Sequence, residues 1–163
     1  MDLLFPFTVG LAVILITVGL HAVTTNQTIY LLKKHEQKRH PLKNGYRSRP
    51  FILGVTGVLL SVKHYIDILL WAFAYWFFAG SANFVNFEDA VYFSSVTYTT
   101  LGYGDVTLSD NWRLLCGIQA MNGILLFGWS TAILFYLFQR FWIEQDKSLQ
   151  KTKPIKNQNE ISQ

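Results

Sequence analysis

The sequence predicts an all-α membrane protein with three transmembrane helices and one short helix that enters the bilayer and returns. Hydrophobic residues make up 51% of the 163 residues and aromatic residues 16%, which is high for a water-soluble chain of this length. Charged residues are segregated, because only Lys63, Asp67 and Arg113 lie inside or at the edge of the long apolar segments. A lipid bilayer is therefore the expected solvent for most of the chain.

The first apolar segment extends from Leu3 to about Tyr30 and contains no Lys or Arg. At about 1.5 Å per residue it is long enough to span a hydrocarbon core of about 30 Å. Asp2 precedes it in place of a positive charge, and no small-residue cleavage motif follows at a suitable distance. We therefore expect residues 1–32 to be a retained transmembrane helix rather than a cleaved signal peptide.

A basic loop is predicted at residues 33–50. Between positions 33 and 49 it holds seven Lys or Arg residues and one acid, Glu36, while Pro41 and the Asn44-Gly45 pair disfavour a continuous helix. The positive-inside rule places this loop in the cytoplasm and the N-terminus outside. A patch that binds anionic lipid or a partner protein is compatible with the same residues.

The second apolar segment, Phe51 to Gly80, is longer than a perpendicular span requires and contains intramembrane charges. His64 and Asp67 share a helix face, and Lys63 is a neighbour of Asp67 on the same helix. His21 is expected at a similar depth. One hypothesis is that His21, His64 and Asp67 form a pH-sensitive cluster. The alternative is a satisfied structural cluster whose lysine extends to the headgroups.

A third, shorter helix is predicted from about Asp89 to Thr99. Glu88 and Asp89 lie at its N-terminus, where the helix dipole favours acids, and Asn86 or Asp89 can cap it. The helix is too short to cross the membrane, and irregular backbone at membrane depth must be buried by protein or line a water-filled path. One chain of this length cannot bury it, so we expect a homotetramer around a central axis.

The next seven residues, 99–105 (TTLGYGD), carry the candidate chemistry. A site for a bare monovalent cation must replace water with protein oxygens, and backbone carbonyls facing one axis are a dense source. Gly102 and Gly104 are free to adopt positive φ, which such a backbone needs. The alternative is an ordinary Gly-rich turn between two helices. The predicted ligands are the carbonyl oxygens of Thr100, Leu101, Gly102 and Tyr103 and the hydroxyl of Thr100.

The stretch TLGYGD at 100–105 resembles the potassium-channel signature, which most often has Val or Ile at the position of Leu101. The preceding stretch DAVYFSSVT at 89–97 is similar to the pore helix of small prokaryotic channels of the two-transmembrane, pore-loop family. The resemblance covers roughly Val55 to Trp142, so the N-terminal helix is an addition to the family pattern. It implies a selectivity filter for K⁺. The residues implied to support this filter are Thr99, Gly104, Asp105 and Tyr92, whose hydroxyl is expected to bond Asp105.

A last transmembrane helix is predicted from Trp112 to about Trp142. Helical spacing predicts a pore-lining stripe along it, with closure by dewetting at Phe135 near the cytoplasmic end. The resemblance implies hinge positions at Gly123 and Gly128, and the alternative is ordinary small-residue packing between helices. The stripe consists of Ile124, Phe127 or Gly128, Thr131 and Phe135.

The chain is thus divided into an N-terminal helix (1–32), a basic cytoplasmic loop (33–50), a pore domain (51–143) and a polar cytoplasmic tail (144–163), which is expected to be disordered. Between residues 81 and 111 there are four acids and no Lys or Arg, which agrees with an outside location. Asp105 and Asp110 are the acids nearest the mouth and raise the local cation concentration.

These patterns predict a passive K⁺-selective channel in the cell membrane, with three further copies, the bilayer and K⁺ as partners. No nucleophile and base pair or metal-ligand spacing predicts an enzyme or a cofactor, and a net charge of +4 gives little support to nucleic-acid binding. The first helix lacks the repeated arginines of a voltage sensor. Two alternatives stay open: a weakly selective cation channel, because Leu101 is unusual, or a non-conducting membrane sensor or assembly subunit.

Overall fold

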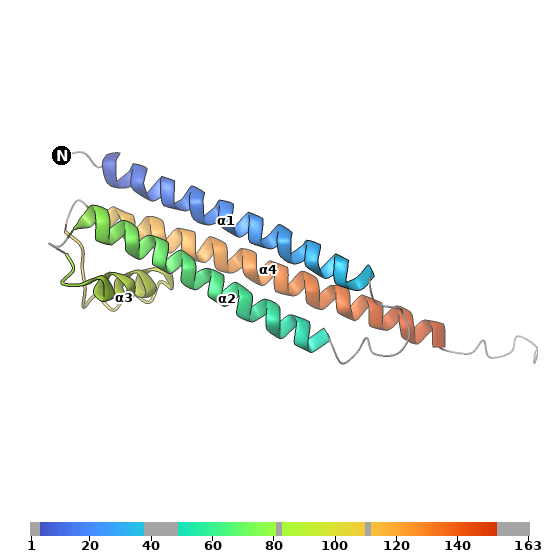
Figure 1. Cartoon of the computed structure of the whole chain (residues 1–163). Helices are drawn as coiled ribbons and strands as arrows, with labels where there is room; N and C mark the ends of the chain where they lie inside the picture. Colours follow the sequence, from blue (N-terminus) through green and yellow to red (C-terminus); the bar gives the residue numbers. More distant parts are fainter. Residues whose placement is uncertain (1–3, 38–48, 81–82, 110–111, 153–163) are drawn as a thin grey trace, which may run out of the picture.

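The computed structural model describes residues 4–37, 49–80, 83–109 and 112–152. Over these residues the chain forms helices and no strands, as the sequence predicts. Figure 1 shows three long helices side by side and one short helix packed against one end of them. The elements are α1 (Leu4–Gln37), α2 (Arg49–Ala74), a π-helical turn (Tyr75–Ala79), α3 (Phe87–Tyr98) and α4 (Arg113–Thr152).

The three long helices contain the predicted membrane spans. Segments long and apolar enough to cross a bilayer cover Leu4–Tyr30, Pro50–Ala79 and Arg113–Ile143, and they are 27, 30 and 31 residues long. At about 1.5 Å per residue each exceeds a hydrocarbon core of about 30 Å. Large apolar side chains remain exposed along them, such as Leu15 at 65% and Val58 at 64%, as expected of helices that face lipid. The prediction of three transmembrane helices is confirmed.

Two helices extend further than the sequence predicts. α1 continues past residue 32 to Gln37, and α4 continues to Thr152, although disorder is expected from residue 144 onward. The expectation of disorder is wrong for residues 144–152, because this stretch (EQDKSLQKT) consists mostly of good helix formers without Gly or Pro. The rest of the predicted basic loop, 38–48, and of the tail, 153–163, lies outside the described residues.

α2 begins and ends at residues whose backbone preferences fit those positions. Pro50 lies in the first turn, where its missing N–H leaves no helical hydrogen bond unmade. At the other end the helix widens into the π-helical turn Tyr75–Ala79. Gly80, with φ 73°, ends this turn in a conformation that residues with a Cβ rarely adopt. The chain then turns back toward α3.

Two apolar clusters hold the bundle together, one on each side of a polar layer. The larger includes Trp71 and Tyr75, both fully buried, and draws on all four helices. The smaller joins Leu60 of α2 to Leu137 of α4. Buried polar side chains, including His64, lie between the two clusters along α2. Burial of these polar groups requires hydrogen-bond partners, which come from neighbouring helices.

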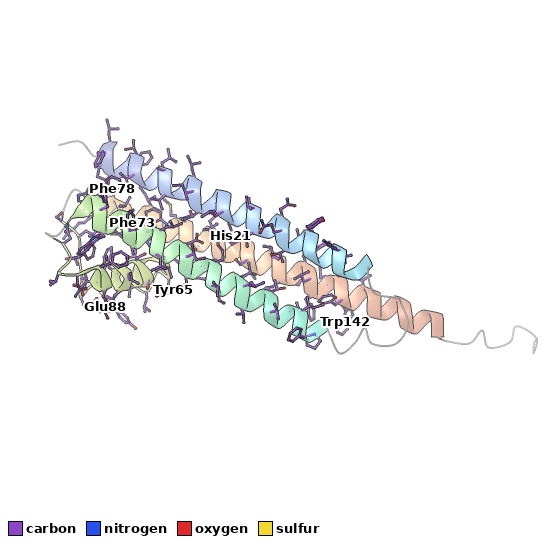
Figure 2. The ribbon with its side chains drawn as sticks, in the orientation of Figure 1. His21, Tyr65, Phe73, Phe78, Glu88 and Trp142 are labelled. Carbon is purple, nitrogen blue, oxygen red and sulfur yellow. The ribbon has the colours of Figure 1, made fainter. Side chains whose placement is uncertain are left out.

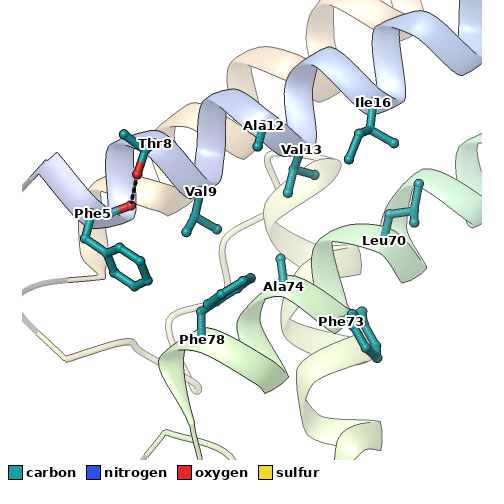
Figure 3. A pocket seen from close by; sticks show the side chains of 10 residues that line it. All are labelled: Phe5, Thr8, Val9, Ala12, Val13, Ile16, Leu70, Phe73, Ala74 and Phe78. Carbon is teal, nitrogen blue, oxygen red and sulfur yellow. Dashed lines mark hydrogen bonds between the residues drawn. The ribbon is translucent and has the colours of Figure 1, made fainter.

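An apolar groove of about 440 Å³ lies between the first turns of α1 and the C-terminal half of α2. Figure 3 shows Phe5 and Thr8 on one side and Phe73 and Phe78 on the other. The hydroxyl of Thr8 donates to the carbonyl of Phe5 at 2.8 Å, so it is already engaged within its own helix. A cation needs several oxygen ligands in exchange for its water, and this lining does not provide them. The groove is therefore no candidate for the ion path.

Candidate functional site

A reciprocal capping arrangement holds α3 at its N-terminus. The side-chain oxygen Oδ1 of Asn86 accepts the N–H of Asp89 at 2.9 Å, and Oδ2 of Asp89 accepts the N–H of Asn86 at 3.3 Å. The helix therefore begins at Phe87, two residues before the predicted start at Asp89. It ends at Tyr98 after 12 residues, which is too short to cross a bilayer.

Buried polar contacts fix α3 against the helices beside it. Gln119 of α4 donates to the carbonyl and the hydroxyl oxygen of Ser94 in α3, at 3.1 and 2.8 Å. The Ser94 hydroxyl donates to the carbonyl of Ile68 in α2 at 2.7 Å, and the Tyr75 hydroxyl donates to the Gln119 side chain at 2.7 Å. The Gln119 amide thus links α4 to α3 and to the π-helical turn that follows α2. Because each lost partner would cost about 1–3 kcal/mol, these contacts define how α3 sits in the bundle.

α3 ends in a Schellman motif that places Thr100 in the left-handed region. The N–H of Leu101 donates to the carbonyl of Val96 at 2.9 Å, and the N–H of Thr100 donates to that of Thr97 at 3.0 Å. The φ angle of Thr100 is 61°. Glycine usually occupies this position, since a residue with a Cβ costs about 1–2 kcal/mol there. A strained threonine at this point is a reason to look for function.

The backbone after Thr100 alternates in handedness. Gly102 and Gly104 have φ angles of 55° and 79°, whereas Leu101 and Tyr103 do not have positive φ. In a regular strand successive carbonyls point to opposite sides, and inversion at every second residue turns alternate peptide planes toward one side. The side chains of Leu101 and Tyr103 are 56% and 67% exposed. A carbonyl-lined cation site needs a backbone of this kind.

Residues 99–105, called the filter segment after the role predicted for them, are joined to α3 by a side-chain hydrogen bond. The Tyr92 hydroxyl donates to Oδ2 of Asp105 at 2.8 Å, which confirms the contact expected from the sequence. Because Asp105 accepts this bond, the pKa of Tyr92 is raised above its ordinary value, and the hydroxyl stays a donor throughout the neutral range. Asp110, the other acid predicted at the mouth, lies outside the described residues.

α4 has a buried face and an exposed face. Its buried face contains three polar residues spaced by three and eight positions, namely Gln119, Asn122 and Ser130, around the apolar Leu126. The predicted pore-lining residues lie outside this face and are exposed: Ile124, Phe127, Thr131 and Phe135. Phe127 lies nearest to the buried face, because its ring also stacks on His64 of α2. Such a face can line a pore, meet lipid or contact another chain, so the pore-lining role of these residues stays a prediction.

The two predicted hinge glycines have different surroundings. A Cβ at Gly123 would overlap the carbonyl oxygen of Tyr98 and lie 3.1 Å from its carbonyl carbon. A Cβ at Gly128 would meet nothing within 4 Å. α4 is a continuous helix through both positions. Gly123 therefore allows α4 to approach the C-terminal end of α3, and a hinge at either residue stays a prediction.

The predicted cluster of His21, His64 and Asp67 lies in the polar layer of the bundle. The two imidazole rings are 5.7 Å apart between their centroids. Lys63 donates to both carboxylate oxygens of Asp67 at 2.6 Å and is buried. The expectation that this lysine extends to the headgroups is therefore wrong, because its nearby carboxylate compensates the buried charge. Sensitivity to pH stays a prediction.

Sequence reasoning missed the polar partners of this cluster. The Tyr98 hydroxyl lies 3.0 Å from Nδ1 of His64, and the Ser130 hydroxyl lies 2.9 Å from Nε2 of the same ring. About two turns before Ser130 on α4, Asn122 donates to the Thr17 hydroxyl of α1 at 2.9 Å. The helical spacing of polar residues in the last apolar segment was an available signal. It indicates a shared face but does not identify the partners.

Residues 64–140 match a family model described as "Ion channel". The match begins in the middle of α2, covers α3 and the filter segment, and ends within α4, so α1 lies outside it. No curated protein and no solved structure matches the chain significantly. The match confirms the resemblance drawn from the TLGYGD stretch and its flanking helices. Over these residues the chain is therefore similar to ion channels, which is consistent with the two-transmembrane, pore-loop type.

Proposed function

We propose that four copies of the chain form a channel that passes K⁺ passively down its electrochemical gradient. The alternating backbone of the filter segment carries this proposal, with φ angles of 61°, 55° and 79° at Thr100, Gly102 and Gly104. Carbonyl oxygens of residues 100–103 replace the water around a permeating ion, and the Thr100 hydroxyl adds an oxygen at the inner end. The ion-channel match across residues 64–140 supports the same function.

The arrangement of α3 adds electrostatic support for a cation. Acids lie in its first turn, at Glu88 and Asp89, and its C-terminal end leads directly into the filter segment. The negative end of the helix dipole is therefore next to the start of the ion path, where it favours a positive charge. Asp105 sits at the other end of the segment and attracts cations to the mouth.

The residues that one chain leaves uncovered support assembly into a homotetramer. The whole stretch from Thr99 to Asp105 is exposed in the single chain, including the apolar ring of Tyr103. Inside a bilayer such backbone must be covered by protein or face water. Four copies around an axis provide both, because the carbonyls face the shared path and Leu101 and Tyr103 pack against neighbouring chains.

In the proposal the protein lies in the plasma membrane of the cell. The N-terminus and the filter segment face the outside, and the 33–50 loop and the C-terminal tail lie in the cytoplasm. The excess of Lys and Arg between positions 33 and 49 and the acids between 81 and 111 support this orientation. No cofactor other than the permeant K⁺ enters the proposal.

Ion flux from the purified full-length protein in liposomes tests the proposal. We expect a K⁺ gradient to drive flux and an equal Na⁺ gradient to drive much less, and we expect native mass spectrometry to give a mass of four chains. Comparable K⁺ and Na⁺ flux would identify a weakly selective cation channel. Absence of both would leave the non-conducting sensor or assembly subunit.

Replacement of Thr100 by glycine separates the strain at this position from its hydroxyl. Glycine removes a backbone cost of about 1–2 kcal/mol per chain, so thermal stability should not fall. The hydroxyl oxygens at the inner end are lost, and we expect the K⁺ over Na⁺ preference in liposome flux to drop by about tenfold. Thr100→Ser keeps the hydroxyl and is the control. An unchanged preference in Thr100→Gly would exclude the hydroxyl as a ligand.

A further inference from the structure

A series of hydrogen-bonded, buried side chains connects α1 to Tyr98, the residue that ends α3. Nε2 of His21, which Figure 2 labels near the middle of α1, lies 3.3 Å from the Ser130 hydroxyl of α4. That hydroxyl lies 2.9 Å from Nε2 of His64 in α2, whose Nδ1 is 3.0 Å from the Tyr98 hydroxyl. Tyr98 in turn donates to Asp67 at 3.4 Å. All five side chains are buried.

The donor and acceptor groups of this series determine the direction of each hydrogen bond. The carboxylate of Asp67 can only accept a hydrogen bond, so the Tyr98 hydroxyl donates to it. The hydroxyl oxygen of Tyr98 in turn accepts a hydrogen bond from the Nδ1–H group of His64. Nε2 of the neutral His64 ring then accepts a hydrogen bond from the Ser130 hydroxyl. The oxygen of Ser130 accepts a hydrogen bond from the Nε2–H group of His21. Nδ1 of His21 is the acceptor that has no partner among the described residues. Loss of Ser130 or His64 interrupts the series between α1 and α3.

Tyr98 is the residue that connects this series of hydrogen bonds to the filter segment. It is the last residue of α3 and is followed directly by Thr99 and Thr100. Its ring packs edge to face on Phe127 at 5.4 Å between centroids, and Phe127 stacks on His64 at 4.4 Å. Its hydroxyl and its ring are therefore each in contact with another helix. A displacement of Tyr98 must also move Thr100, the first of the proposed K⁺ ligands, because only Thr99 separates the two residues.

α1 approaches the rest of the bundle along one face. Gly10, Thr17 and His21 recur at helical spacing on this face, and each meets α4. At Gly10 an added Cβ would lie 2.8 Å from a methyl group of Leu115. Of these three contacts, the one at His21 continues through hydrogen bonds as far as Tyr98.

We infer that α1 acts on the pore through this series, with His21 and Ser130 as positioning residues that hold Tyr98 and the filter segment in their conducting geometry. The inference rests on the proposed function for its effect on ion flux. It assigns a role to a helix that lies outside the matched ion-channel domain. A purely structural cluster would stabilise the bundle without changing the filter segment in particular.

Hydrogen exchange of the full-length protein in lipid nanodiscs tests the coupling without requiring conduction. The N–H groups of Leu101 and Gly102 both donate to the carbonyl of Val96, at 2.9 and 3.3 Å, and report on the filter segment. In Ser130→Ala and in His21→Leu we expect these amides to exchange about fivefold faster, the effect of losing one hydrogen bond. The double variant should be no faster than either single variant, because both changes break the same connection.

Two further variants separate positioning from general packing. His21→Gln retains a side-chain N–H donor and should exchange like the wild type. Ser61→Ala removes an exposed hydroxyl that donates only to the carbonyl of Gly57 in its own helix, so it is the matched control and should change nothing. In liposomes, Ser130→Ala and His21→Leu should also lower the K⁺ over Na⁺ preference, whereas Ser61→Ala and His21→Gln should not.

Wild-type exchange at Leu101 and Gly102 in folded Ser130→Ala would overturn the inference. If His21→Leu fails to fold, Ser130→Ala decides alone, because it removes a single oxygen atom. If the wild type passes no K⁺, the proposed function fails, while the exchange measurements still decide whether α1 is coupled to the filter segment.

Discussion

Replacement of Gly102 by alanine is expected to abolish the K⁺ over Na⁺ preference of the proposed channel. Gly102 has a φ angle of 55°, and a Cβ added there would meet nothing within 4 Å, so the cost is a backbone cost and not a clash. An alanine in this conformation costs about 1–2 kcal/mol. Four such residues surround one ion path in the proposed tetramer, and together they disfavour the conducting backbone by about 4–8 kcal/mol.

Such a cost lowers the population of the conducting backbone by about a thousandfold or more. Each chain should still fold, because Gly102 lies after α3 has ended. K⁺ and Na⁺ flux in liposomes measures the effect, and thermal unfolding in detergent measures stability. Gly19→Ala in α1 is the matched control, since a Cβ there also meets nothing within 4 Å and the backbone is helical. Normal K⁺ preference in Gly102→Ala would contradict the assignment of the filter.

The membrane architecture was predictable because it depends on composition and length. Three long apolar segments gave three transmembrane helices, and a capping residue near Asn86 gave the short helix, with its start misplaced by two residues. The helical extension through residue 152 was missed, because a polar composition suggests disorder, whereas local helix propensity decides the backbone when no Gly or Pro intervenes.

The finer features of the candidate site depend on contacts between distant parts of the chain. Ser130 lies 109 positions from His21 and 66 from His64, so sequence spacing, which compares neighbours on one helix, does not connect them. The left-handed conformation of Thr100 was missed for a different reason. Glycine marks such positions in a sequence, and a threonine there is recognised only when the hydrogen bonds that end α3 are known.

Replacement of Gly123 by alanine is expected to separate α4 from α3 and to disrupt the filter. The added Cβ would overlap the Tyr98 carbonyl oxygen, and it would lie 3.1 and 3.3 Å from the carbonyl carbon and Cγ of the same residue. Two of these atoms belong to the backbone of α3, which cannot turn aside as a side-chain tip can. Overpacking of this kind costs about 1–3 kcal/mol, and the higher helix propensity of alanine recovers only about 1 kcal/mol of it.

The clash at the Tyr98 carbonyl is expected to affect K⁺ flux more than its energy alone suggests. Tyr98 directly precedes Thr99 and Thr100, so a displaced carbonyl shifts the start of the ion path in every chain. We expect Gly123→Ala to lower the unfolding temperature of the assembly by several degrees and to abolish selective K⁺ flux. Gly117→Ala in the same helix meets nothing within 4 Å and should change neither. Gly128→Ala separates the two roles of the glycines, since loss of flux without loss of stability there would indicate a hinge. A Gly123→Ala protein as stable and selective as Gly117→Ala would show that the close approach of α4 to Tyr98 is not required.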